Sequence, residues 1–174
     1  VVHVAINSVT SDGQVAKVIE GNNTAIGNGA NVPNGTADNQ VRIGNAAVTY
    51  AGVQVAWTVT SDKRLKSNIK DSDIGLDFIK QLRPVSYIRK NDESKKLEYG
   101  FIAQEVKETL KNNGVTNSGI ISEADDSTIS VRYNDIIAPM VKALQEQQKL
   151  IEIQKTEIEA LKKQSQEAIE RMKR

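Results

Sequence analysis

The C-terminal part of the chain, residues 134–174, repeats its apolar side chains every seven residues and contains no glycine or proline after Pro139. A heptad repeat of this kind is typical of long helices that pack along one another, with a rise of about 1.5 Å per residue. We therefore predict one long helix, packed with partner chains in a coiled coil or helix bundle. A charged helix lying along its own domain is the alternative. The two registers of the repeat are Ile137, Leu144, Ile151, Ile158, Ser165 and Met172, and Met140, Gln147, Gln154, Leu161 and Ala168.

Two consecutive positions of the second register are glutamines, Gln147 and Gln154. A polar layer inside a helix bundle lowers its stability, but it also fixes the register and the number of helices. We expect the two glutamines to have this effect, because the first register stays apolar over the same stretch.

The composition limits the size of any core. Of the 174 residues, 39% are hydrophobic and only 4% are aromatic, which favours an elongated or oligomeric molecule whose copies complete each other's burial. A net charge of +1 gives no general attraction to nucleic acid or to anionic membranes. The lack of cysteine excludes disulfides and thiol catalysis. Residues 1–20 lack the pattern of a signal peptide, and because the chain begins with Val1 we expect it to be a fragment of a longer protein.

Residues 1–60 are rich in Gly, Asn, Val and Ala and repeat themselves loosely. Residues 25–30 (Ala-Ile-Gly-Asn-Gly-Ala) are echoed by residues 42–47, which places Ile26 and Ile43 17 residues apart. Short strands separated by Gly/Asn turns and stacked as in a solenoid would explain this repeat. An irregular β-rich linker is the alternative. The predicted strands cover residues 15–19, 41–43 and 53–59.

Between Lys66 and the long helix, the pattern predicts a small α+β unit. Apolar residues from Ile74 to Leu82 share one helical face, and Pro84 ends that helix at or just before Arg83. Asn134 or Asp135 is predicted to cap the long helix, whose start is complicated by Pro139. The remaining predicted elements are a hairpin of strands 85–89 and 97–102 around a polar turn, a helix over 103–112 and a short strand over 128–131.

The junction between these two parts reads Thr-Ser-Asp-Lys-Arg-Leu-Lys at residues 60–66. A serine hydroxyl becomes a nucleophile when a neutral lysine removes its proton, so Ser61 and Lys66 form a candidate catalytic pair. A lysine in water has a pKa near 10.4, and burial or neighbouring cations must lower it for this role. Arg64 is expected to bind the carboxylate of Asp62.

The spacing of the pair sets a geometric condition. An odd offset places Ser61 and Lys66 on opposite faces of a regular strand. A turn between them, or a lysine from a neighbouring chain, is needed to bring the two groups within about 3 Å. Without such a bend the pair is inert.

Residues 58–174 carry an ordered set of motifs. These are Ser61-Asp62-x-Arg64-Leu65-Lys66-x-Asn68-Ile69, Leu82-x-Pro84-Val85-x-Tyr87, Tyr99-Gly100-Phe101-Ile102-Ala103-Gln104-Glu105-Val106, Val131-x-Tyr133 and the terminal heptads. In order and spacing the set resembles the C-terminal intramolecular chaperone, auto-processing domains of phage tailspikes, tail fibres and neck appendages.

The resemblance implies a trimer that guides the folding of the β-rich fibre ahead of it and then cuts its own chain. Carried over by position, the scissile bond is Thr60–Ser61, Ser61 is the nucleophile and Lys66 is the general base. Asp62, Arg64 and Asn68 are motif positions to which we assign supporting roles. The implied fold is α+β, with the end of an elongated trimeric fibre over 1–60, and a chaperone domain over 61–174 that divides into an α+β head (61–133) and the helix (134–174).

The implied partners are two further copies of the chain, in a homotrimer, and the upstream fibre segment, which is both folding client and substrate. We expect no nucleic-acid or membrane partner, no cofactor and no metal. The upstream part would belong to the virion, in a tail fibre or appendage, and the released domain to the host cytoplasm during assembly. A non-catalytic trimeric fibre tip, structural or receptor-binding, is the alternative function.

Three other features are assigned structural roles. His3, the one histidine, lies too far from Ser61 along the chain for a Ser-His-Asp triad. Residues 27–31 (Gly-Asn-Gly-Ala-Asn) lack the Gly-Lys-Ser/Thr ending of a phosphate loop and are predicted to form turns. Glu123, Asp125 and Asp126 lack the alternating spacing of a calcium loop and are predicted to form a solvated acidic turn.

Overall fold

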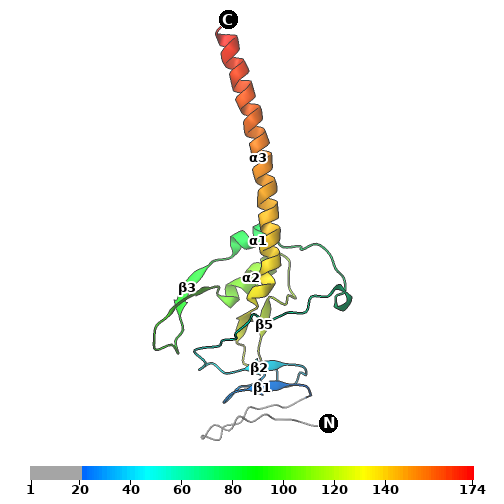
Figure 1. Cartoon of the computed structure of the whole chain (residues 1–174), viewed down its shortest axis with the longest axis vertical. Helices are drawn as coiled ribbons and strands as arrows, with labels where there is room; N and C mark the ends of the chain where they lie inside the picture. Colours follow the sequence, from blue (N-terminus) through cyan, green and yellow to red (C-terminus); the bar gives the residue numbers. More distant parts are fainter. Residues whose placement is uncertain (1–20) are drawn as a thin grey trace. The chain divides into compact units, whose positions relative to one another are not determined.

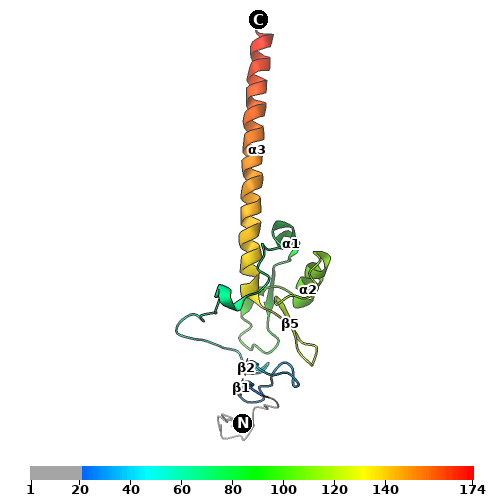
Figure 2. The same ribbon diagram turned by 90° about the vertical axis from the view of Figure 1, so that its right-hand side faces the viewer.

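The computed structural model of the chain describes residues 21–174, so His3 and the predicted strand 15–19 lie outside the described residues. Within this range the chain is α+β, as predicted, with three two-stranded sheets, short helices and one long C-terminal helix (Figures 1 and 2). The trimeric fibre and the coiled coil stay predictions. None of the helices within residues 21–174 has the length and continuous hydrophobicity needed to cross a lipid bilayer.

The chain forms two compact units, each built from separate stretches of sequence. Unit 1 comprises Val1–Ser67, Pro84–Ala103 and Ile121–Val131, of which residues 1–20 are not described. Unit 2 comprises Asn68–Arg83, Gln104–Ile120 and Arg132–Arg174. These units follow contacts within one chain, and the predicted domain boundary at Ser61 stays a prediction.

The repeat near the start of unit 1 is a stack of two parallel strands. β1 (Thr24–Ile26) pairs with β2 (Val41–Ile43) so that Ile26 lies beside Ile43, 17 residues later (Figure 1). Before and after the strands, asparagine side chains also bond to residues 17 positions away. The Asn22 amide donates to the Asn39 side chain at 2.8 Å, and the Asn45 amide donates to the Asn28 carbonyl at 2.7 Å. The sequence repeat therefore corresponds to one turn of a solenoid, as predicted.

The glycine of each Ile-Gly-Asn repeat has a specific reason to be there. Gly27 and Gly44 have φ values of 116° and 73°, in the left-handed region that favours glycine. The two residues also lie close together, since a Cβ on Gly27 would stand 3.5 Å from the Gly44 Cα. A Cβ on Gly44 would overlap the Val48 side chain. The corners of the solenoid turn thus require glycine for both conformation and space.

Two antiparallel hairpins complete unit 1. β3 (Val85–Ile88) pairs with β4 (Leu97–Gly100), which confirms the predicted hairpin with slightly shorter strands. Its turn is held by the Asp92 carboxylate, which accepts the N–H groups of Ser94 and Lys96 at 2.9 and 3.0 Å. β5 (Ile121–Glu123) pairs with β6 (Ile129–Val131). The sequence predicted β6 but not β5, although each strand has three residues.

The predicted strand over residues 53–59 is wrong for the single chain. The chain bends at Gln54 and Val55, and no described residue pairs with the backbone of residues 49–60. Val53, Val55 and Trp57, which are β-prone residues of this segment, are exposed. A strand needs a neighbour for its backbone and a cover for its apolar face, and the described residues supply neither to this segment.

Unit 2 is helical and contains most of the buried apolar side chains. α1 (Leu76–Gln81) packs against α3 (Ile137–Met172), and α2 (Ala103–Asn112) belongs to the same unit except for its first residue (Figures 1 and 2). The positions of α1 and α2 agree with the predicted helices. The buried hydrophobic residues of the unit are Ile74, Phe78, Val106, Leu110, Ile120, Ile136 and Ala143.

The start of α3 differs from the prediction. Asn134 and Asp135 lie in a single 3-10 turn, Tyr133–Ile136, and neither caps the long helix, which begins at Ile137 without a side-chain cap. Asp135 instead pairs with Arg132, with a nitrogen–oxygen distance of 3.3 Å. Pro139 fits the first turn of α3, because the N–H groups of that turn have no partner inside the helix.

Two side chains of α3 hold the segment that leads into α1. The Glu146 carboxylate accepts the Leu76 N–H at 2.7 Å and so caps the start of α1. This N–H, together with the nearby Lys142 ammonium, holds the pKa of Glu146 below its usual range. The Lys142 ammonium donates to the Ser72 carbonyl. A Cβ on Gly75 would lie 2.5 Å from the Glu146 carboxylate, so glycine allows this close approach.

Beyond this contact α3 continues as a single uninterrupted helix, and every residue from 147 to 174 is exposed. Its 36 residues span about 54 Å at a rise of about 1.5 Å per residue. Leu144, Ile151 and Ile158 of the first heptad register are 64, 50 and 51% exposed. The predicted long helix is confirmed, and its apolar seam is exposed.

Phe78 should be the most sensitive position of unit 2, because its side chain is fully buried. Replacing Phe78 with alanine should lower the free energy of unfolding by about 3–5 kcal/mol. Urea denaturation followed by circular dichroism would measure this. Lys80→Ala, an exposed change on the same helix, is the control and should shift stability by less than about 0.5 kcal/mol. Equal effects of the two changes would contradict the assigned core.

Candidate active site

The junction motif folds as a tight turn. Residues Lys63–Leu65 form a single 3-10 turn, and the Asp62 carboxylate caps it by accepting the Arg64 N–H at 2.8 Å. The Arg64 guanidinium binds the same carboxylate, with its closest nitrogen 2.6 Å from the oxygen. This pairing holds the pKa of Asp62 below its usual range and raises that of Arg64. The expected Asp62–Arg64 pair is therefore present, and it stabilises the turn from both ends.

The turn brings the two candidate catalytic groups together. The Lys66 ammonium donates a hydrogen bond to the Ser61 hydroxyl, with Nζ 2.7 Å from Oγ. The Lys66 N–H closes the turn by donating to the Lys63 carbonyl at 3.1 Å. The geometric condition that the odd spacing sets is thus met within one chain, and no lysine from a neighbour is needed for contact.

Both groups of the pair face water. Ser61 and Lys66 are exposed, as is Thr60 on the other side of the predicted scissile bond. The arrangement places a hydroxyl and an amine at hydrogen-bonding distance, and both are exposed to solvent.

Asn68 has a conformational role that the sequence reasoning did not identify. Its φ is 52°, in the left-handed region that asparagine tolerates better than most residues with a side chain. Asn68 therefore turns the backbone two residues after Lys66. This conformation gives a reason for an asparagine at this position, and the supporting role of Asn68 stays a prediction.

Residues 27–30, Asp125 and Asp126 lie in turns or loops, as predicted, but Glu123 lies in strand β5 instead. Gly27 accepts a hydrogen bond from the Ala30 N–H at 3.2 Å, so residues 27–30 close a turn. Asp125 and Asp126 lie in the connection between β5 and β6, where Asp126 accepts the Thr128 N–H at 2.9 Å. Within residues 21–174 no group of three or more His, Asp or Glu side chains is placed to share a metal ion.

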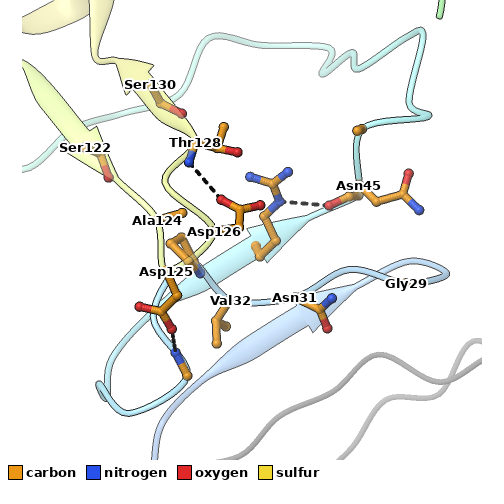
Figure 3. A pocket seen from close by; sticks show the side chains of 15 residues that line it. Gly29, Asn31, Val32, Asn45, Ser122, Ala124, Asp125, Asp126, Thr128 and Ser130 are labelled. Atoms are coloured by element: carbon orange, nitrogen blue, oxygen red, sulfur yellow. Dashed lines mark hydrogen bonds between the residues drawn. The ribbon is translucent and has the colours of Figure 1, made fainter. Parts of the chain in front are cut away.

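Asp125 makes a contact that the sequence reasoning missed. Its carboxylate accepts the Gly35 N–H at 2.8 Å, and its own N–H donates to the Pro33 carbonyl at 2.9 Å (Figure 3). The β5–β6 hairpin thereby holds the loop between β1 and β2. An open hollow of about 520 Å³ lies beside the contact, lined by residues of both segments, among them Val32, Asn45 and Ser130. No local sequence signal marks a contact between residues 90 positions apart.

The match to a known family covers the motif and the elements that follow it. Residues 61–115 match the family model described as the chaperone of endosialidase. The match begins at Ser61 and ends beyond α2, and it confirms the resemblance to a C-terminal intramolecular chaperone domain. The matching family model is also named as a peptidase family, which supports a protease-related, auto-processing domain. No curated protein matches the chain.

The Asp62 cap should make the turn sensitive to acid. The pKa of Asp62 lies below its ordinary value of 3.8, so its contribution is complete above that value and is lost as the pH falls through the lowered pKa. In Ser61→Ala protein, the amide NMR signal of Arg64 should therefore titrate below pH 3.8 towards the position it has in Asp62→Asn. An Arg64 signal that moves only together with global unfolding would contradict this.

Proposed function

We propose that the chain is an intramolecular chaperone that trimerises, sets the register of the β-rich fibre ahead of it, and releases itself by cutting the Thr60–Ser61 bond. One observation carries the proposal. The Ser61 hydroxyl lies 2.7 Å from the Lys66 amine, at the first residue of the segment that matches the chaperone family. The match supports the chaperone role, and the pair supports the cleavage.

The proposed reaction uses the two groups in sequence. Neutral Lys66 accepts the hydroxyl proton of Ser61, and Oγ attacks the carbonyl carbon of Thr60. The C–N bond breaks as Lys66 returns the proton to the Ser61 nitrogen, which leaves Thr60 joined to Ser61 through an ester. Water then hydrolyses the ester to give the Thr60 carboxylate and a free Ser61 hydroxyl. Each chain performs this once.

The exposure of the pair indicates what else the reaction requires. A lysine acts as a base only when its amine is neutral, and removal from water favours the neutral form. Because Ser61 and Lys66 are exposed in a single chain, we propose that neighbouring copies or the upstream fibre cover them in the assembled molecule. Cleavage then follows assembly, and the contact within each chain is ready in advance.

The chaperone role rests on the cost of aligning separate chains. Ordering identical strands in register has a large entropic cost, and few local contacts offset it. A helix that associates first raises the effective concentration of the chains and sets their register. The Asp125 contact supports a further step, because the β5–β6 hairpin holds the loop at residues 33–35 on the fibre side of the cut. Cutting afterwards removes the element that set the register. A fibre that unfolds after the cut therefore cannot readily refold, so its stability becomes kinetic.

The proposed partners follow from this role. They are two further copies of the chain in a homotrimer, and the upstream fibre segment as client and substrate. Nucleic acid, membranes, cofactors and metals have no part in it. The released domain acts in the host cytoplasm during assembly, and the fibre stays in the virion.

Substituting either member of the pair should stop the cleavage. The expressed chain should yield a fragment that begins at Ser61, detected by intact mass and N-terminal sequencing. Ser61→Ala should stay uncut, and Lys66→Ala should be cut at least about a hundredfold more slowly because it lacks the base. Lys63→Ala, in the same turn but outside the pair, is the matched control and should be cut at nearly the wild-type rate.

A different result would favour the alternative, a non-catalytic fibre tip. If the wild-type chain and both variants all stay intact in an assembled trimer, the protease assignment fails and the structural role remains. A chain that sediments as a monomer at every concentration would exclude the chaperone mechanism as well.

The hold of the hairpin on residues 33–35 can be tested separately. In the Ser61→Ala background, Asp125→Ala should speed hydrogen exchange at the Gly35 amide by up to about tenfold, since the amide loses its acceptor. Asp125→Asn keeps an acceptor oxygen and is the matched control. Equal exchange in the two variants would show that the Asp125 side chain does not hold the loop.

A further inference from the structure

Unit 1 has very little core of its own. Of its described residues, only three hydrophobic ones are buried, Ala25, Ala30 and Val32, and none of them has a large side chain. Large apolar residues are instead exposed, including both members of the stacked pair, Ile26 at 45% and Ile43 at 59%. A fold of this size needs more buried apolar surface than this, so a further apolar cover would have to come from beyond these described residues.

The largest uncovered apolar feature in unit 1 is the segment directly before the predicted cut. Every second residue from 53 to 59 is apolar, and we call these four residues the valine–tryptophan face. The residues between them are Gln54, Ala56 and Thr58. Their alternation is that of a strand with one buried side, although no strand forms in the single chain. The valine–tryptophan face consists of Val53, Val55, Trp57 and Val59, which are 57, 79, 74 and 70% exposed.

We propose that residues 53–59 form a strand only in the assembled protein, where the valine–tryptophan face packs against the same face of a second copy of the chain. This inference rests on the proposed assembly and names the surface that completes it. The bends at Gln54 and Val55 straighten when the segment gains a cover. The predicted strand then forms only when a second copy covers its apolar face.

The charge pattern favours an identical copy as the occupant. When identical segments assemble in register, each residue meets its own equivalents, so any charge would face a like charge. Residues 49–60 contain no Asp, Glu, Lys or Arg, so this penalty is absent over the whole segment. A partner with a different sequence could pair with charges in this segment. It would therefore not explain why residues 49–60 are uncharged while the neighbouring residues 62–66 are strongly charged.

The exposed area also fits this occupant. The four side chains expose on the order of 500 Å² per chain, against roughly 800 Å² per partner in a standard interface. The exposed apolar seam of α3 supplies a second contact between the same copies. The valine–tryptophan face therefore does not have to hold the assembly together by itself.

The position of the face has a consequence for the cut. Val59 is separated from the predicted scissile bond only by Thr60. Packing of the valine–tryptophan faces would place the Thr60–Ser61 bonds of the copies at the same level. The cut would then be made where the registered strand ends, and the strand would remain with the fibre.

Trp57 makes the proposal directly testable, because it is the one tryptophan of the chain. The experiment uses the full-length Ser61→Ala protein, so that the segment stays attached. The emission of Trp57 should shift to shorter wavelength, and its quenching by acrylamide should fall, over the concentration range in which sedimentation shows assembly. An assembled protein whose Trp57 is quenched like that of the urea-unfolded chain would overturn the inference and leave the coiled coil and the cleavage unaffected.

Two matched substitutions test which side of the segment is covered. Val55→Lys places a charge in the valine–tryptophan face and should restore the quenching of Trp57 and weaken self-association at least about tenfold. Gln54→Lys places the same charge on the opposite side and should leave both properties near those of the Ser61→Ala parent. Equal effects of the two lysines would contradict the proposed face. Cleavage is assayed separately on chains that retain Ser61, so an uncut wild type with a buried Trp57 would reject the protease and keep this interface.

Discussion

The structure depends above all on where apolar surface can be buried. Among the described residues this happens mainly in unit 2, where α1 packs against α3 and where Phe78 and Val106 are buried. The C-terminal part of α3 and several large apolar residues in the described part of unit 1 are exposed. In the assembly that we propose, other copies of the chain would cover these surfaces, which suits the proposed chaperone role.

The candidate active site needs much less support. Asp62, the 3-10 turn and the Arg64 side chain form a local structure that brings Ser61 and Lys66 into contact without help from distant residues. The pair is therefore in contact within one chain but is exposed to water. The proposed reaction thus has two requirements. One chain provides the contact between Ser61 and Lys66, and we propose that assembly removes the solvent around them.

Periodic features were predictable from the sequence, and features that depend on a partner were not. The 17-residue repeat became the offset between β1 and β2, and the heptads became α3. The same reasoning failed for residues 53–59, because an alternating pattern shows that one side of a strand is covered but not which chain covers it. It also failed at Asn134 and Asp135. These residues are suited to capping a helix, but they lie inside the 3-10 turn that precedes α3.

The sequence by itself determined the long helix, the spacing of the solenoid turn, the β3–β4 hairpin and the residue types of the Ser61–Lys66 pair. These depend on periodicity and on neighbours along the chain, which a sequence displays directly. Only the tertiary structure decided that Asp125 holds Gly35 and that Glu146 caps α1. Those contacts join residues 90 and 70 positions apart, and a carboxylate in a sequence carries no mark of the distant N–H group that it will bind.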